Sequence, residues 1–179
     1  MKLLLTMCAA AALCTPAFAQ KSGMINRNAP TISQTVTAGN AKISLNYTSL
    51  AWGQGKAFDE AMDKAGGADA RKNINDLAKK QPIGDLSTSV DLTCGDLRIP
   101  AGDYKVAFTI NDNAEWQINF IGKETLTMKL PLMDNKEMPH KRLLMCLYAG
   151  DSDGAGVYVA FGTKFAILSL APAGGEKKG

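Results

Sequence analysis

Between residues 87 and 170 apolar and polar side chains alternate with a period of two, and this pattern strongly restricts what the chain can fold into. In residues 104–110, for example, every second side chain is large and apolar, as in a strand with one buried face. Short runs of this kind, separated by turn residues, are typical of an antiparallel sandwich or barrel. The expected strands are residues 31–37, 43–47, 87–94, 104–110, 116–120, 126–130, 142–148, 157–161 and 165–170. We therefore expect a mostly β fold, an antiparallel β-sandwich of the jelly-roll-like or Ig-like kind.

Residues 56–80 interrupt the alternation with helical spacing. Apolar residues recur at positions 58, 61, 62 and 65 and again at 70, 74, 77 and 78, which is the spacing of one helix face. Gly66 and Gly67 separate the two runs, and Pro82 follows the second. We expect a short helical hairpin at about 56–80 with solvated charged sides, inserted into a β-sandwich domain of residues 31–171.

Residues 1–19 have the features of a secretory signal peptide. Lys2 provides a positive charge, an apolar stretch follows over residues 3–13, and Ala17 and Ala19 place small residues before a cleavage point at Gln20. We therefore expect a periplasmic or secreted protein. Residues 20–30 are expected to be a flexible lead-in, and residues 172–179 a disordered tail.

Composition excludes several classes of partner. The apolar fraction of 46% and the charged fraction of 21% are those of a chain that buries a core. A formal net charge of +3 is too small to indicate a nucleic-acid partner.

No apolar run after the leader approaches the ~20 residues of a transmembrane helix, so we expect no transmembrane segment in the mature chain. Cys8 and Cys14 lack the preceding small residue of a lipidation site, so we expect cleavage without lipidation.

Two cysteines follow the leader, Cys94 and Cys146. Each lies on an apolar alternation, so both are expected to point into the core. An even number of cysteines in an oxidising compartment permits a disulfide, and Cys94 and Cys146 are our disulfide candidates; the alternative is two buried thiols that do not meet.

Residues that could support catalysis or bind a metal are sparse. His140 is the single histidine, which leaves a Ser-His-Asp triad or a zinc site without its usual set of partners. Asp151 and Asp153 resemble the start of a calcium loop, but no closing glutamate follows, so we expect a hairpin turn. We expect no metal and no cofactor. Carboxylates of a glycosidase type remain open, and the candidates are Asp103, Asp112, Glu115 and Glu124.

Aromatic residues are the more informative candidates for binding. Alternation predicts that Tyr104 and Trp116 face the core. Trp52 lies outside a clear alternation and beside Gly53, so we expect it to be an exposed aromatic residue that contacts a ligand.

Several motifs together resemble a known bacterial family. They are Ile43-Ser44-Leu45-Asn46-Tyr47 followed by Trp52-Gly53, then Pro100-Ala101-Gly102-Asp103-Tyr104, Glu115-Trp116 and Phe161-Gly162. Over residues 41–170 the chain is similar to the secreted domain-of-unknown-function family numbered twenty-nine eleven. The resemblance implies a β-sandwich in which the Pro-Ala-Gly motif forms a hairpin, and it implies no activity. The helical insert departs from that family's pattern.

These observations favour a non-catalytic module over an enzyme, because the scaffold lacks a nucleophile paired with a base. The expected function is an envelope or ligand-binding module whose partner is an envelope protein, a glycan or a small apolar ligand. Two alternatives stay open: a glycan-acting hydrolase that uses carboxylates only, and a lipocalin-like carrier, which needs an apolar cavity inside a closed barrel.

Overall fold

The computed structural model describes residues 29–51, 56–150 and 154–173. The predicted leader, Trp52 and the calcium-loop candidates Asp151 and Asp153 lie outside the described residues.

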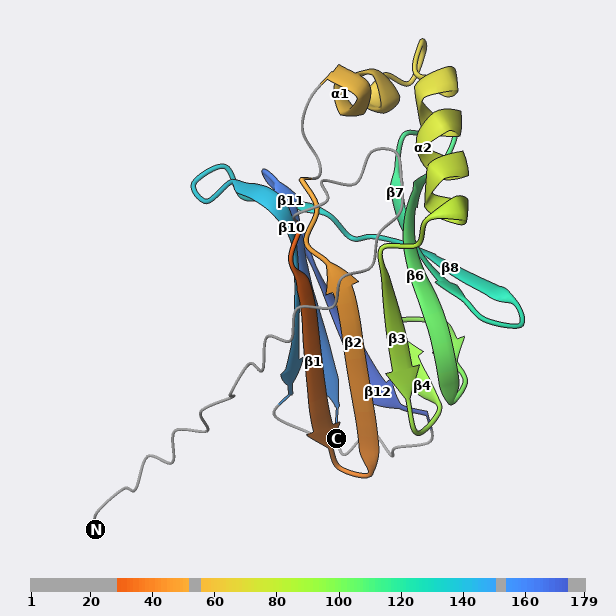
Figure 1. Cartoon of the computed structure of the whole chain (residues 1–179), viewed down its shortest axis with the longest axis vertical. Coiled ribbons are helices and arrows are strands. Elements are labelled where there is room, and N and C mark those ends of the chain that lie inside the picture. Colours follow the sequence, from red (N-terminus) through yellow and green to blue (C-terminus); the bar gives the residue numbers. More distant parts are fainter. Residues whose placement is uncertain (1–28, 52–55, 151–153, 174–179) are drawn as a thin grey trace.

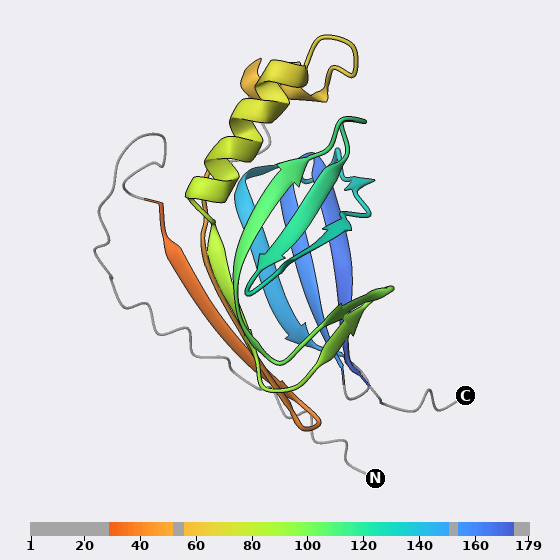
Figure 2. The same ribbon diagram turned by 90° about the vertical axis from the view of Figure 1, so that its right-hand side faces the viewer.

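The chain forms two antiparallel sheets packed face to face, which confirms the prediction of a mostly β sandwich. The first sheet holds, in spatial order, β1 (Thr31–Ala38), β2 (Ala41–Thr48), β3 (Gly84–Thr88), β6 (Gly102–Ile110), β7 (Trp116–Ile121) and β8 (Thr125–Lys129). The second holds β10 (His140–Ala149), β11 (Ala155–Gly162), β12 (Lys164–Pro172), β4 (Leu92–Cys94) and β5 (Leu97–Ile99), while β9 (Met133–Asp134) pairs with β12. Figure 1 shows the strands running along the long axis, and Figure 2 shows the two layers from the side.

The core lies between the two sheets and takes alternate residues from each strand. On β2 the buried residues are Ile43, Leu45 and Tyr47, and on β7 they include Trp116 and Ile118. Each large apolar side chain removed from water in this way contributes about 1.5–3 kcal/mol. Trp116 therefore faces the core, as its alternation predicts.

Two helices cover one end of the sandwich, which confirms the predicted helical hairpin (Figure 1). They are α1 (Lys56–Met62) and α2 (Ala68–Lys80). Arg71 of α2 is buried, contrary to the expectation of a solvated charged face. Its Nη1 donates to the carbonyl oxygens of Ala61 at 3.0 Å and Asp63 at 2.7 Å. The guanidinium thus satisfies carbonyl groups at the end of α1 that have no partner within the helix.

The side chain of Asn75 fixes α2 to the sheet. Its Nδ2 donates to the carbonyl oxygen of Ile110 at 2.8 Å, and its Oδ1 accepts the backbone N–H of Ile110 at 2.8 Å. β3 pairs with β6 only as far as Gly84 and Val106. The Asn75 carboxamide therefore bonds to the part of β6 that lies beyond the end of β3. The helical end is therefore joined to the strand that leads into the β6–β7 turn.

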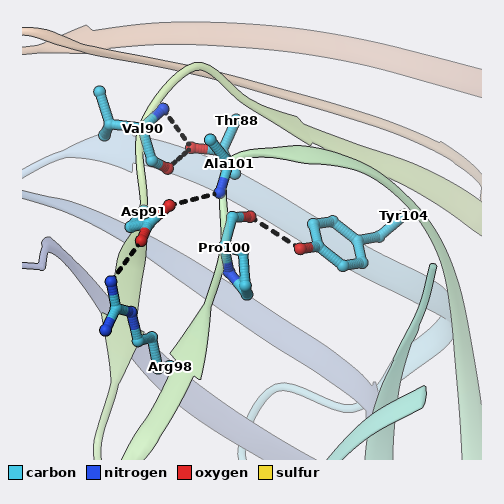
Figure 3. A network of polar contacts seen from close by, with 7 residues as sticks. All are labelled: Thr88, Val90, Asp91, Arg98, Pro100, Ala101 and Tyr104. Carbon is cyan, nitrogen blue, oxygen red and sulfur yellow. Dashed lines mark hydrogen bonds and ion pairs between the residues drawn. The ribbon is translucent and has the colours of Figure 1, made fainter. Parts of the chain in front are cut away.

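Two bends at the corner drawn in Figure 3 carry the chain between the sheets. Residues 87–94, expected as one strand, divide into β3 of the first sheet and β4 of the second. The prediction was wrong because alternation continues through the bend: Thr88 and Leu92 are both buried. Asp91 secures the bend by accepting the N–H of Ala101 at 2.8 Å and an Arg98 N–H at 2.6 Å. These two donors hold the pKa of the Asp91 carboxyl group below its usual value.

The Pro-Ala-Gly motif forms the return crossing rather than the expected hairpin, because β5 and β6 belong to different sheets. The Tyr104 hydroxyl donates to the carbonyl oxygen of Pro100 at 2.7 Å (Figure 3). Its ring covers Gly122, where a Cβ atom would lie 3.0 Å from Tyr104 Cε1. The hydrogen bond holds the hydroxyl group at the corner of the sandwich. For this reason the Tyr104 side chain is only partly buried.

One long edge of the sandwich is joined by side chains that bond to backbone groups. β1 and β10 are edge strands of different sheets. Gln34 Nε2 donates to the carbonyl oxygen of Met145 at 2.9 Å, and its Oε1 accepts the N–H of Leu147 at 2.5 Å. Nearby, Ser49 Oγ donates to the carbonyl oxygen of Leu143 at 2.8 Å. The Gln34 carboxamide thus pairs with the edge of β10 as a peptide group of a neighbouring strand would.

The expected lead-in and tail are partly included in the fold. Pro30 accepts the N–H of Ser49 at 2.9 Å, so the predicted lead-in of 20–30 is wrong at its last residues. Pro172 pairs with Leu92, and Ala173 donates to the carbonyl oxygen of Asp91 at 2.8 Å. Pro172 and Ala173 therefore belong to the fold, and residues 20–28 and 174–179 lie outside the described residues.

Candidate functional site

A cavity of about 490 Å³ lies at the helical end of the sandwich, a size typical of small-molecule sites. It is bounded by α1, the turn before β7, the end of β8 and the β11–β12 turn. Its apolar lining is Phe58, Met62, Ala114, Trp116, Leu130, Pro131, Leu132 and Phe161. We call this the α1 cavity.

Three aromatic rings form the inner wall of the α1 cavity. Phe58 of α1 stacks on Trp116 of β7, with ring centroids 5.6 Å apart and an interplanar angle of 20°. Phe161 of β11 meets the edge of Trp116 at 5.2 Å and 61°. Trp116 and Phe161 are only 4% and 2% exposed, so core packing fixes two of the three rings. Their edges present a preformed apolar wall.

The β6–β7 turn places Ala114 and Glu115 at the cavity. Asn111 Oδ1 accepts the N–H groups of Asn113 at 3.0 Å and Glu115 at 2.9 Å. Ala114 has φ +59°, a left-handed conformation that costs a residue with a Cβ atom about 1–2 kcal/mol. The hydrogen bonds of Asn111 hold this conformation and keep the Ala114 methyl group in the cavity wall.

Paired charges surround the mouth of the cavity. Glu115 accepts from Lys129 at 2.5 Å, and Lys164 donates to Asp134 at 2.6 Å. Lys129 and Asn111 hold the pKa of the Glu115 carboxyl group below its usual value, and Lys164 does the same for Asp134. Both of these cations therefore have an anionic partner, and the lining holds one further carboxylate, that of Asp59.

The carboxylates proposed for a hydrolase do not gather in this cavity. Glu115 lines it, whereas Asp103, Asp112 and Glu124 are not among its lining residues. A glycosidase also needs a general acid with a raised pKa, and the pKa of Glu115 is lowered. Glu115 is therefore suited to an ion pair and unsuited to proton donation.

His140 lies at the start of β10 and faces an aromatic ring. Its ring centroid is 6.5 Å from that of Tyr158 at an interplanar angle of 70°. Within residues 29–51, 56–150 and 154–173, no three His, Cys, Asp or Glu side chains come together as a group that could hold a metal ion.

The two cysteine candidates do not form the expected disulfide: both are free thiols, Cys94 buried and Cys146 exposed. In β10 the residues at 143–148 are nearly all apolar, so alternation cannot decide which set faces the core. Leu143, Met145 and Leu147 are buried, and Cys146 therefore points outward. β11 and β12 also separate β10 from β4 in the sheet. Burial raises the pKa of the Cys94 thiol to about 11, which makes it a poor nucleophile.

The space between the sheets is filled. The inner residues, among them Leu45, Phe120 and Leu168, leave a cavity of only about 10 Å³, at most room for one water. A lipocalin-like carrier needs an apolar chamber in this position, so the packed core counts against that alternative.

Sequence reasoning missed two of the three ring positions in the α1 cavity. In the sequence, Phe58 stands on a predicted helix face, and Phe161 stands at the end of the predicted strand 157–161 and in the Phe161-Gly162 motif. Gly162 follows Phe161 with φ +53°, so the motif has a structural reason: it ends β11 beside the cavity. Trp52, the expected contact aromatic, lies outside the described residues.

Comparisons of the chain with protein-family models, with curated proteins and with solved structures found no match. Neither helix among the described residues has the length and the apolar composition needed to cross a bilayer.

Proposed function

We propose that this chain is an exported, non-catalytic ligand-binding module that takes a small apolar ligand in the α1 cavity. The observation that carries the proposal is the wall of three aromatic rings, held by the core. Binding in a preformed site loses little free energy to ordering of the protein. The burial of Trp116 and Phe161 favours a compact apolar ligand over a sugar, which would need a broad exposed ring to stack on.

The leader and the family resemblance support a role in the bacterial envelope. Residues 1–19 support export, and the motif at Pro100–Tyr104 is one of those by which the sequence resembles a secreted family. In the fold, that motif forms the crossing between the sheets, so its role is structural. The proposed ligand site lies at the other feature, the end of the sandwich that carries the helical insert.

Ligand binding is tested with N-phenyl-1-naphthylamine, an uncharged aromatic probe that fluoresces when it leaves water. We expect saturable binding and at least a tenfold loss of affinity, about 1.4 kcal/mol, in Met62→Lys. Met62 lines the cavity and is 41% exposed, so the variant should fold while placing an ammonium group in an apolar wall.

Met138→Lys is the matched control, because Met138 is exposed and lies outside the cavity lining. Its probe affinity is expected to equal that of the unmodified chain. Absence of saturable binding, or equal losses in the two variants, would remove the α1 cavity as the ligand site.

Export is tested by the intact mass of the protein purified from its native envelope. Cleavage between Ala19 and Gln20 should give a chain that begins at Gln20, without lipid on Cys8 or Cys14. A mass that includes residues 1–19 would contradict export by a cleaved signal.

A further inference from the structure

We propose that β12 binds a short extended peptide of another protein by strand addition, at the part of its edge that lies between β9 and β4. We call this part of the edge, the backbone of residues 167–169, the β12 gap. The peptide would pair with it mainly through its own backbone. The proposal does not depend on the α1 cavity and adds a second site to the molecule.

β12 has a continuous neighbour on one side and an interrupted one on the other. It pairs with β11 from its first residue to Leu170 without a shift in register. On the opposite side it pairs with β9 only at its first two residues, and with β4 only at Ala171 and Pro172. No further strand of the described residues pairs with β12. Residues 166–170 therefore lie inside a sheet but have a neighbouring strand on one side only.

The backbone groups of Ile167 and Ser169 point into this gap. Groups of successive residues in a strand point alternately to its two sides. Thr163, just before β12, accepts an N–H from the residue after β9 at 2.7 Å, and Ala173, just after β12, donates to the residue before β4 at 2.8 Å. The odd-numbered residues therefore point toward β9 and β4. Within the described parts of the chain, Ile167 and Ser169 have no hydrogen-bond partner on that side.

These unpaired groups match the backbone of an antiparallel strand. Main-chain N–H and C=O groups are strong hydrogen-bonding groups that folded proteins nearly always pair. At the opposite long edge of the sandwich, the Gln34 carboxamide pairs with the backbone of β10. β9 and β4 are both antiparallel to β12. A peptide in the same direction between them would make four hydrogen bonds, two with Ile167 and two with Ser169.

The length of the gap favours a short peptide over a second copy of the chain. Met133 of β9 lies opposite Phe165, and Thr93 of β4 lies opposite Ala171. These two positions on β12 are separated by roughly 20 Å, at about 3.3 Å per residue. β9 and β4 close the two ends of the gap, so the straight edge strand of another sandwich would collide with them. A peptide that pairs over about three residues can bend away at both ends.

The alternation of β12 determines which side chains the peptide would need. Ile167 and Ser169 are exposed on the outer face of the sheet, whereas Leu168 points inward and is only 3% exposed. Paired residues share a face, so the middle residue of the peptide would point inward and its two neighbours outward. On this side of the sandwich, which faces the viewer in Figure 2, Leu126 and Met128 of β8 are only partly buried. The middle residue should therefore be apolar.

Hydrogen exchange of the purified full chain, followed by NMR, tests the gap itself. We expect the amide hydrogens of Ile167 and Ser169 to exchange at least tenfold faster than those of Ala166 and Leu168, which point to β11. Protection of Ile167 and Ser169 in the free chain would overturn the proposal, because another segment of the chain or a second copy would then cover the gap.

Peptide binding is tested with a capped pentapeptide of alternating valine and threonine, with valine at its two ends and in the middle. Its addition up to about 5 mM, a range that detects weak affinity, should slow the exchange of Ile167 and Ser169 at least tenfold. Methylation of its second and fourth amide nitrogens, which face β12, should abolish binding. Methylation of the third, which points away, should not. Absence of saturable binding, or equal effects of the two methylation patterns, overturns the proposal.

Ser169→Pro tests the same contact from the side of the protein. Proline lacks the N–H that points into the gap, and a strand tolerates proline where that N–H is not part of the ladder. We expect at least a tenfold loss of peptide affinity in this variant and unchanged affinity in Ser169→Ala, which keeps the N–H. Equal affinities of the two variants would contradict strand addition at this position. Far-UV circular dichroism verifies folding, and the methylated peptides decide the proposal if the proline variant does not fold.

Discussion

Replacing Phe161 with alanine is expected to lower the free energy of unfolding by about 3–5 kcal/mol. Phe161 is almost fully buried and touches both Trp116 and Phe108, with ring centroids 5.2 Å and 6.5 Å away. Removal of the ring leaves a void in the wall between the core and the α1 cavity. The loss is measured by urea denaturation monitored by circular dichroism, since fluorescence from Trp116 would itself change.

The matched control is Phe165→Ala, four residues farther along the same β-hairpin. Phe165 points to the outer face and is only partly buried, so its removal should cost clearly less than removal of Phe161. Comparable losses at the two positions would mean that the packing assigned to Phe161 is wrong. If the Phe161 variant stays folded, its larger cavity should also change the affinity for the naphthylamine probe.

Alternation predicted the sandwich well wherever one side of a strand is polar. In β2, Ile43 and Leu45 alternate with Lys42 and Ser44, and the buried set is the apolar set. In β10 the side chains on both faces are apolar. The sequence therefore indicates a strand but does not show which face of it points into the core. The error at Cys146, and with it the expected disulfide, follows from that ambiguity.

The candidate site was less predictable because its parts are distant in the chain. Phe58 and Phe161 each look like an ordinary apolar residue of a helix or a strand. They line one cavity, each against Trp116, only because α1 covers the end of the sheets. Hydrogen bonds of Arg71 and Asn75 hold the helices there. The sequence does not indicate the roles of Arg71 and Asn75. A buried arginine that bonds to carbonyl groups and a solvated arginine give the same helical pattern.

Gln34→Glu is expected to destabilise the chain by about 1–3 kcal/mol at neutral pH, since a partly buried carboxylate oxygen would then face the carbonyl oxygen of Met145. The carboxamide now donates to Met145 and accepts from Leu147. An introduced carboxylate keeps the second bond but opposes the carbonyl oxygen of Met145. A protonated carboxyl group can make both bonds, so its folded-state pKa should lie above its unfolded value of about 4.3. A group with a raised folded pKa contributes stability that is present below the unfolded pKa and lost as pH rises through the folded pKa.

Urea denaturation at a series of pH values, with each variant compared to the unmodified chain at the same pH, measures this directly. Gln34→Glu should approach the unmodified chain near pH 4 and fall below it as pH rises. Gln34→Leu should lose both hydrogen bonds, about 0.5–1.5 kcal/mol for each, with no dependence on pH. A pH-independent deficit in the glutamate variant would show that the side chain does not bridge β1 and β10. That edge of the sandwich would then be joined by the hydrogen bonds between Ser49 or Leu50 and β10, which do not involve Gln34.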